Sequence, residues 1–305
     1  MTRRFRFGIQ LSEAGSRAEW AAAARRAEAA GFDVLTVPDH VGRQLSPFAA
    51  LVAAAEATDR IRLGTFVLDN DFRHPLLTAH EAATVQVLTE GRFELGIGAG
   101  WLGRDYERLG IEFAAPRVRF ERLREAVEIL ELYFRGDRFS FRGRHYRIED
   151  AEPIAIPGGA PPLVIGGGGP RMLSLAGEQA DVASVFLTSL PDGSGFDETG
   201  ARPEAYEKKV STVRAAGAGR AVELNVLLQH VEVTEDRAGI AEKTAPEWGV
   251  DARAYPALPF VLLGTPAQMA DDLLERRDRY GISYVTVFDK DAEHLAPVIG
   301  LLAGR

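Results

Sequence analysis

The sequence of 305 residues contains no cysteine, which excludes disulfide bonds and any thiolate that could act as a nucleophile or metal ligand. Lysine occurs only at positions 208, 209, 243 and 290, so arginine carries most of the positive charge. No stretch approaches the run of about eighteen apolar residues that a transmembrane helix requires. The N-terminal stretch lacks the apolar region of a signal peptide. These absences predict a cytoplasmic protein that makes no contact with a membrane.

The chain also lacks the net positive charge that is typical of nucleic-acid-binding proteins. The formal net charge is −8 and the sequence pI is about 5.4, whereas a phosphate backbone binds a basic surface. Hydrophobic residues make up 46% of the chain, which is enough for the core of one large domain. No linker divides the chain, so we expect a single domain over residues 1–305 that binds a small-molecule substrate.

Apolar segments of strand length alternate with helical segments along the chain. The helix expected at Ser16–Gly31 has a capping box at Ser16 and Glu19 and ends at a glycine. Eight strands, each followed by a helix, predict an α/β fold of the (β/α)8 or TIM-barrel type. A doubly wound sheet is the alternative, but the count of repeats favours the barrel. The strands are expected at Phe5–Leu11, Val34–Val37, Ile61–Leu68, Phe93–Ile97, Leu163–Ile165, Val182–Phe186, Val222–Val233 and Tyr284–Phe288.

Three segments do not fit the repeat and are expected to be insertions. Residues 138–160 begin with an alternating pattern around Arg142 and Gly143 that predicts a β-hairpin. Residues 189–202 are rich in glycine and proline, and residues 236–259 form the third insertion. Loops as long as residues 189–202 and 236–259 often cover an active site, so these two segments are candidates for a lid.

Four consecutive glycines, Gly166, Gly167, Gly168 and Gly169, follow the fifth expected strand and precede a helix that begins at Pro170. Glycine lets backbone N–H groups approach an anion closely, and a helix N-terminus adds partial positive charge. Arg171 could add a full positive charge. The pattern therefore predicts a phosphate site. The alternative is a turn that needs glycine because of a positive φ.

Other candidate residues also follow strands, at the end of a barrel where active sites lie. His40, after the second strand, could act as an acid or base, although it could also serve as a loop hydrogen-bond partner. Trp101, after the fourth strand, could form a flat wall beside a planar ligand or simply pack in the core. His230 lies in an apolar strand and is interpreted as a core histidine. No cluster has the spacing of metal ligands, so no metal site is expected.

These motifs, taken together and in order, resemble the luciferase-like monooxygenase superfamily, in the branch that uses the deazaflavin coenzyme F420. No single motif is specific to this family, but the order and spacing of the motifs along most of the chain are specific to it. The matching residues are Gly31-Phe32-Asp33, Pro38-Asp39-His40, Arg60-Ile61-Arg62-Leu63-Gly64-Thr65, Arg73-His74-Pro75, the segment from Gly91 to Trp101, and the glycine run after Pro161-Pro162.

The resemblance implies a luciferase-like barrel that holds coenzyme F420, or alternatively FMN, at the carboxyl ends of its strands. By that analogy the glycine run with Arg171 would hold the cofactor phosphate, and Asp39 and His40 would lie near the reactive ring. A non-proline cis peptide bond would fall at Phe66-Val67 and lie against the ring. Gly98 and Gly100 would line its other side.

The resemblance further implies an oxidoreductase that transfers a hydride between F420 and a small organic substrate, with His40 as the catalytic proton carrier. Trp101 and Phe186 would line the substrate pocket. Sugar-phosphate dehydrogenases of this branch carry an acidic glutamate where Trp101 stands, so that specificity is not expected here. The alternatives are an FMNH2-dependent monooxygenase that uses O2 and a non-catalytic flavin-binding barrel. A homodimer is expected by analogy.

Overall fold

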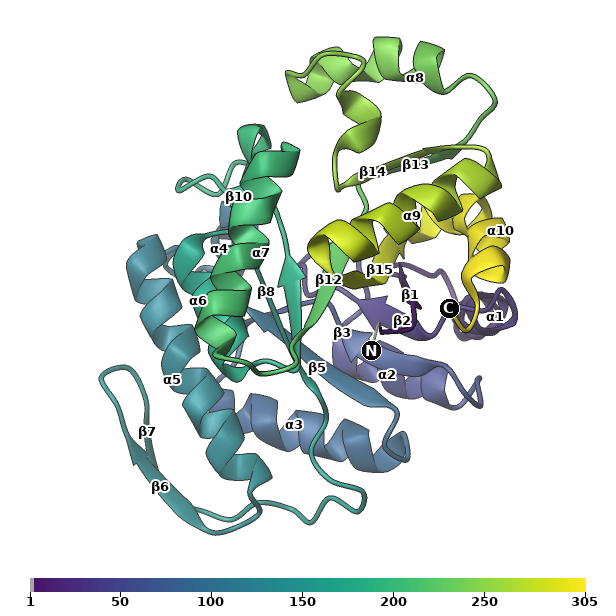
Figure 1. Cartoon of the computed structure of the whole chain (residues 1–305). Coiled ribbons are helices and arrows are strands. Elements are labelled where there is room, and N and C mark those ends of the chain that lie inside the picture. The colour runs from purple at the N-terminus through teal and green to yellow at the C-terminus, as the bar shows by residue number, and fades with distance from the viewer. Residues whose placement is uncertain (1–2) are drawn as a thin grey trace.

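The computed structural model describes residues 3–305, and eight parallel strands at its centre close into a barrel (Figure 1). β15 pairs with β1, and β3 pairs with β5, so the ring has no free edge. The predicted (β/α)8 barrel is confirmed, and the doubly wound alternative is wrong. In ring order the strands are β1 (Arg6–Gln10), β2 (Val34–Val37), β3 (Arg62–Thr65), β5 (Phe93–Gly98), β8 (Leu163–Gly167), β9 (Val182–Val185), β12 (Glu223–Leu227) and β15 (Ile282–Phe288).

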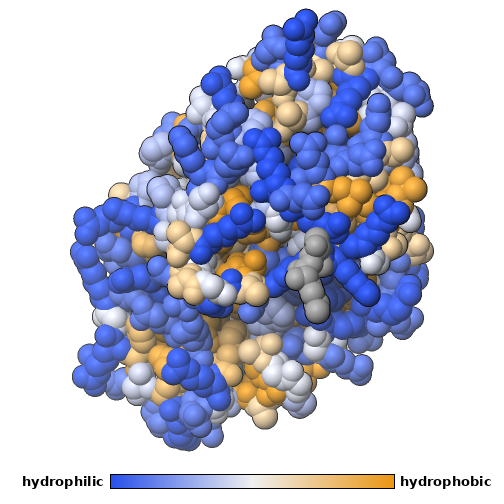
Figure 2. All heavy atoms as spheres, in the orientation of Figure 1, coloured by the Kyte–Doolittle hydropathy of each residue, from blue (hydrophilic) through white to orange (hydrophobic). Residues whose placement is uncertain are grey.

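Helices cover the outside of the barrel. Six of them begin with a proline at the first turn, where the missing N–H costs no hydrogen bond. None of the helices formed by residues 3–305 has both the length and the apolarity of a membrane span. The face drawn in Figure 2 is mostly hydrophilic. The helices are α1 (Arg17–Ala29), α2 (Pro47–Ala55), α3 (Pro75–Leu88), α5 (Pro116–Phe134), α6 (Pro170–Gln179), α7 (Pro203–Gly217), α9 (Pro266–Tyr280) and α10 (Ala292–Leu302).

The three expected insertion segments carry secondary structure of their own. Residues 138–160 contain the antiparallel hairpin of β6 (Phe139–Arg142) and β7 (Arg147–Ala151). Residues 189–202 contribute to the short pair β10 (Thr188–Ser189) and β11 (Phe196–Asp197), followed by η2 (Glu198–Ala201). Residues 236–259 hold α8 (Arg237–Thr244), η3 (Ala245–Trp248) and η4 (Tyr255–Ala257), and α8 projects beyond the barrel in Figure 1.

The single strand predicted over Val222–Val233 is wrong. The chain leaves the barrel after β12, and β13 (His230–Val233) pairs instead with β14 (Val261–Gly264) in a separate two-stranded sheet. This sheet packs beneath α8 and η4, where a small second core forms around Tyr255. His230 therefore lies outside the barrel, with its Nδ1 2.7 Å from the Tyr255 hydroxyl.

The strand predicted over Ile61–Leu68 is interrupted. β3 ends at Thr65, and two residues later β4 (Leu68–Asp69) continues alongside β5. The chain then turns through η1 (Asn70–Phe72) into α3. A further helix that the sequence patterns did not predict, α4 (Gly103–Leu109), follows β5. A last short turn, η5 (Asp289–Asp291), joins β15 to α10.

A buried ion-pair cluster joins three barrel strands. Glu94 on β5 accepts hydrogen bonds from Arg6 Nη1 on β1 at 2.8 Å and from Arg62 Nε on β3 at 2.6 Å, and its side chain is 3% exposed. Burial alone would raise the pKa of Glu94, but the two guanidinium groups outweigh burial and hold this pKa below its ordinary value. The ionised glutamate therefore stabilises the closed barrel.

We expect Glu94→Gln to lower the free energy of unfolding by about 3 kcal/mol near neutral pH. This value is at the low end for the loss of one partner of a buried ion pair, because both arginines are partly exposed. Because the folded-state pKa is depressed, this stability is present above the unfolded-state pKa and is lost as pH falls through the folded-state pKa. Denaturant unfolding should therefore show the two proteins converging in acid. Glu207→Gln, in an exposed pair with Arg279, is the control and should change stability by less than about 1 kcal/mol. Equal stability of Glu94→Gln and wild type at all pH values would contradict the assignment.

Candidate functional site

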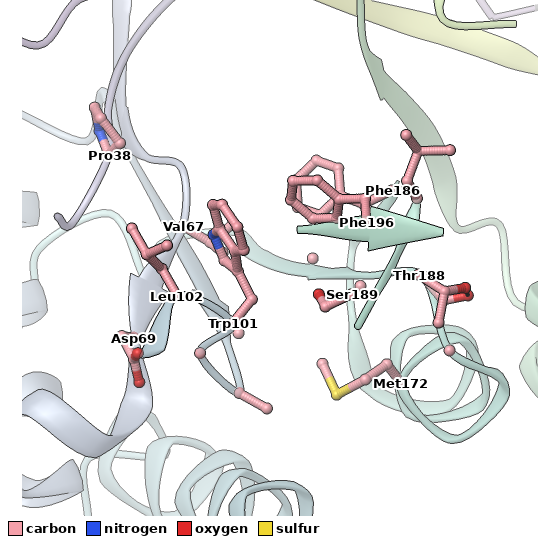
Figure 3. Close-up of a pocket in the computed structure, with 18 of the residues that line it drawn as sticks. Pro38, Val67, Asp69, Trp101, Leu102, Met172, Phe186, Thr188, Ser189 and Phe196 are labelled. Carbon is pink, nitrogen blue, oxygen red and sulfur yellow. Dashed lines mark hydrogen bonds between the residues drawn. The ribbon is translucent and has the colours of Figure 1, made fainter. Parts of the chain in front are cut away.

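A cavity of about 420 Å³ opens at the carboxyl ends of the barrel strands. In Figure 3, Asp69, Trp101 and Leu102 lie on one side of it, and Met172, Phe186 and Thr188 lie on the other. Arg171 lies in the first turn of α6, is exposed and is not part of the lining. The cavity brings together every other predicted site residue: Asp39, His40, Phe66, Val67, Gly98, Gly100, Trp101, Gly166, Gly167, Gly168, Gly169 and Phe186.

The glycine run connects β8 to α6, and none of its four residues has a positive φ. The interpretation as a turn that requires positive φ is therefore wrong. Close packing explains three of the glycines, because a Cβ would lie 2.7 Å from Phe186 at position 166 and 2.6 Å from Met172 at position 167. At position 168 a Cβ would lie 2.3 Å from the carbonyl oxygen of Leu187. At Gly169 a Cβ would meet nothing within 4 Å, so this residue faces open space.

The glycine run also leaves hydrogen-bond donors free. Within residues 3–305, the N–H groups of Gly168 and Gly169 donate to no backbone or side-chain acceptor. Gly169 is the N-cap of α6 and offers no side chain to satisfy the first turn of that helix. Free amides at a helix N-terminus attract an anion. This part of the cavity can therefore bind a phosphate group.

A buried lysine supports the glycine run from the side of α7. Lys209 Nζ donates to the carbonyl oxygen of Phe186 at 2.7 Å, and the Thr188 hydroxyl donates to the carbonyl oxygen of Gly168 at 3.1 Å. Burial lowers the pKa of Lys209 to about 8, and the nearby charge of Asp197 opposes this shift. These contacts hold residues 186–188 against the glycine run. Lys209 lies on a predicted helix, but nothing in its local pattern marked it.

The peptide bond between Phe66 and Val67 is cis, as the resemblance implies. Val67 projects between β5 and β8, where glycines leave room for it. A Cβ on Gly98 would lie 3.0 Å from Val67 Cγ2, and a Cβ on Gly166 would lie 3.1 Å from Val67 Cγ1. The shape of the cavity floor therefore depends on Val67 and on the absence of side chains at Gly98 and Gly166.

His40 is held by a buried carboxylate. Its Nδ1 lies 2.7 Å from Oδ2 of Asp105, a residue of α4 that is 1% exposed. A carboxylate accepts only from a protonated Nδ1, so Nε2 is the nitrogen left to exchange a proton with a ligand. Neither α4 nor Asp105 was predicted, because the pairing joins residues 65 positions apart.

Asp39 is engaged with protein groups. Arg73 binds both of its carboxylate oxygens, at 2.6 and 3.0 Å, and the backbone N–H of Asp69 donates to it at 3.1 Å. A bidentate guanidinium pair of this kind fixes geometry as well as charge. Asp39 thus ties the loop that carries His40 to β4, and its direct contact with a cofactor stays a prediction.

The remaining walls are largely aromatic. The rings of Trp101 and Phe196 lie 4.4 Å apart, and those of Phe66 and Phe186 meet edge to face at 5.5 Å. Phe196 belongs to β11, so the β10–β11 insertion closes one side of the cavity. Among the lining residues contributed by the described chain, 3–305, only Arg119 carries a permanent positive charge, and it donates to the carbonyl oxygens of Ala99 and Ala114.

No group of three or more histidine or carboxylate side chains within the described part of the chain is arranged to hold a metal ion. The cavity offers the free amides of the glycine run, one histidine–carboxylate pair, the carboxyl groups of Asp39 and Asp69, and apolar walls.

Comparison with known proteins agrees with this geometry. A family model described as luciferase-like monooxygenase matches residues 3–283. The chain is 38% identical over 167 residues to an F420-dependent glucose-6-phosphate dehydrogenase of Mycobacterium avium, a match that covers 51% of this chain and 49% of that protein. It is 35% identical over 207 residues to the enzyme of the same name from Nocardia farcinica. That match covers 64% of this chain and 57% of the Nocardia protein. The chain thus aligns with about half of the length of these relatives.

Two solved structures show the same fold over almost the whole chain. The coenzyme F420 dependent tetrahydromethanopterin reductase from Methanopyrus kandleri has a TM-score of 0.77 at 22% identity, covering 98% of this chain and 100% of that one. An F420-dependent secondary alcohol dehydrogenase, in complex with an F420-acetone adduct, has a TM-score of 0.73 at 20% identity and covers 97% of both chains.

Proposed function

Because the chain belongs to the luciferase-like monooxygenase family, we propose that it is an oxidoreductase that transfers a hydride between coenzyme F420 and a small organic substrate. The observation that carries the proposal is the pair of free N–H groups at Gly168 and Gly169, at the N-terminus of α6 and on the cavity wall. The names of the relatives at 35–38% identity favour F420 over FMN.

The residues of the cavity fit a cofactor that joins a phosphate to a flat ring system. The amides of the glycine run would hold the phosphate, and Phe66, Val67 and Gly98 would lie along the ring. The bound cofactor would supply the hydride chemistry. His40 would take up or release the accompanying proton at Nε2, while Asp105 holds the ring and stabilises its protonated form. The aromatic walls would keep water from the reacting atoms.

The lining supports an apolar or aromatic substrate over a sugar phosphate. Arg119 is the only lysine or arginine that the described residues bring to the lining. Its guanidinium already donates to two backbone carbonyls and lies over the ring of Phe113. A second phosphate group would therefore find no free cation there. Trp101, Phe186 and Phe196 instead offer flat apolar contacts. We propose that these three residues set the substrate preference.

The test offers purified protein both cofactors and then a panel of substrates. We expect submicromolar binding of F420 and much weaker binding of FMN, measured by fluorescence titration. Protein loaded with oxidised F420 should oxidise apolar alcohols faster than glucose 6-phosphate, and protein loaded with reduced F420H2 should reduce the corresponding ketones. Tight binding of FMN with no binding of F420 would instead favour a flavin-dependent monooxygenase, and binding of neither would contradict a redox function.

A further inference from the structure

The cavity lining includes a buried carboxyl group that the proposed function does not use. Asp69 on β4 lines the cavity, is 8% exposed and is labelled in Figure 3. Its Oδ1 accepts hydrogen bonds from the Tyr106 hydroxyl at 3.0 Å and from the backbone N–H of Asp71 at 2.9 Å. Its Oδ2 makes no hydrogen bond to any group within residues 3–305. One carboxyl oxygen is thus fixed by two hydrogen bonds, and the other has no hydrogen-bond partner among these residues.

The surroundings of Asp69 favour its protonated form. Burial is the largest effect and raises the pKa of Asp69 to about 7, and the charges of Asp71 and Asp39 add to this rise. The hydrogen bonds from Asp71 N–H and Tyr106 oppose it. The nearby arginines do not pair with Asp69, because they bind other groups. The charged and titratable groups facing Asp69 are Asp39 after β2, Asp71 in η1, Arg73 before α3, Tyr106 in α4 and Arg119 in α5.

One helix contacts both His40 and Asp69. Asp105 and Tyr106 are consecutive residues of α4; Asp105 binds His40, and Tyr106 binds Asp69. Gly100 lets this helix come close, because a Cβ there would lie 2.2 Å from both Asp69 Oδ2 and the Tyr106 hydroxyl. His40 and Asp69 are therefore held in place by one rigid element rather than by independent loops.

Hydride transfer to a deazaflavin requires two proton movements. An alcohol that is oxidised to a ketone loses a hydride and a proton, and a deazaflavin that is reduced gains a hydride and a proton. The first proton leaves the substrate oxygen, and the second reaches a different atom, on the cofactor ring. A residue in contact with the substrate oxygen can therefore accept the first proton but does not supply the second.

We propose, on the basis of the proposed function, that Asp69 is the second proton-transfer residue of this cavity. In the oxidising direction, His40 would take the hydroxyl proton of the substrate, the bound cofactor would supply the hydride acceptor, and protonated Asp69 would give the proton that the cofactor gains on reduction. His40 then releases a proton to water and Asp69 regains one from water, so the reaction needs no other reactant. The reverse direction uses the same groups in opposite roles.

The first test is a titration of the protein without cofactor. Aspartate is labelled with 13C at the side-chain carboxyl, and the carboxyl resonances are followed by NMR from about pH 5 to about pH 9, a range in which ordinary aspartates do not titrate. We expect one resonance with a midpoint near neutral pH in the wild type that is absent from Asp69→Asn. Tyr106→Phe should move that midpoint to higher pH and Asp71→Asn should move it to lower pH.

The second test uses turnover. Asp69→Asn should lower kcat by about 100-fold while changing the Kd for F420 by less than about threefold. In Tyr106→Phe and Asp71→Asn, the limb of the pH–rate profile assigned to Asp69 should move with the NMR midpoint, which a purely structural role would not produce.

Absence of a carboxyl resonance that titrates in this range would overturn the proposal, and so would wild-type turnover by Asp69→Asn. Failure of the proposed function is seen separately, as a wild type that does not bind F420. The titration without cofactor still decides in that case whether Asp69 holds a proton near neutral pH.

Discussion

Gly169→Leu is expected to lower the affinity for F420 by about 100-fold or more, equivalent to about 2.7 kcal/mol, and to leave thermal stability unchanged. The backbone at position 169 has φ −83° and ψ 153°, which any residue adopts, and a Cβ there meets nothing within 4 Å. The leucine side chain would therefore fill the open space before the first turn of α6 without displacing a protein group. Fluorescence titration with F420 and thermal unfolding measure the two effects.

Two further variants separate steric blocking from damage to the fold. Gly300→Leu is the matched control, because Gly300 is exposed in α10, has no positive φ and also has nothing within 4 Å of a Cβ. It should bind F420 as the wild type does. Gly168→Ala should lose both affinity and about 1–3 kcal/mol of stability, because its Cβ would lie 2.3 Å from a backbone oxygen. Wild-type affinity in Gly169→Leu would show that no phosphate binds at this site.

The barrel could be predicted from the sequence because each of its units is signalled locally. A short apolar run, a helix start such as Ser16 or Pro75 and a helical repeat recur eight times, and closure of the ring follows from the count. The cavity lining followed from the same logic, since residues after the strands must meet at one end of the barrel. His40, Trp101 and the glycine run were placed there correctly.

What the sequence did not reveal depends on contacts between distant segments. The apolar pattern continues through Leu227 and His230, so it does not mark where the chain leaves the barrel; that is decided by the pairing of β13 with β14, about 30 residues later. The partners Asp105 and Lys209 lie on helices with ordinary charged patterns, and only the fold brings them to His40 and Phe186. Arg171 was assigned to the phosphate because it follows the glycine run, but its side chain is exposed on α6 and not part of the cavity lining.

His40→Gln is expected to lower kcat by about 1,000-fold, within the range of a general acid–base residue, and to leave the Kd for F420 almost unchanged. Glutamine keeps a side-chain amide that can donate to Asp105, so the buried carboxylate retains a partner and the fold should persist. Stopped-flow measurement of hydride transfer, together with F420 titration, separates chemistry from binding. Unchanged turnover would remove His40 from the mechanism.

Asp105 acts on the reaction only through His40, and a double-mutant cycle tests this assignment. Asp105→Asn leaves the ring of His40 with a neutral partner that does not stabilise its protonated form, so kcat should fall by about 10–100-fold. The combined variant His40→Gln/Asp105→Asn should be no slower than His40→Gln alone, because the carboxylate has nothing left to stabilise once the imidazole is gone. Additive losses in the cycle would instead mean that Asp105 contributes independently of the histidine, through the position of α4 and hence through Tyr106 and Asp69.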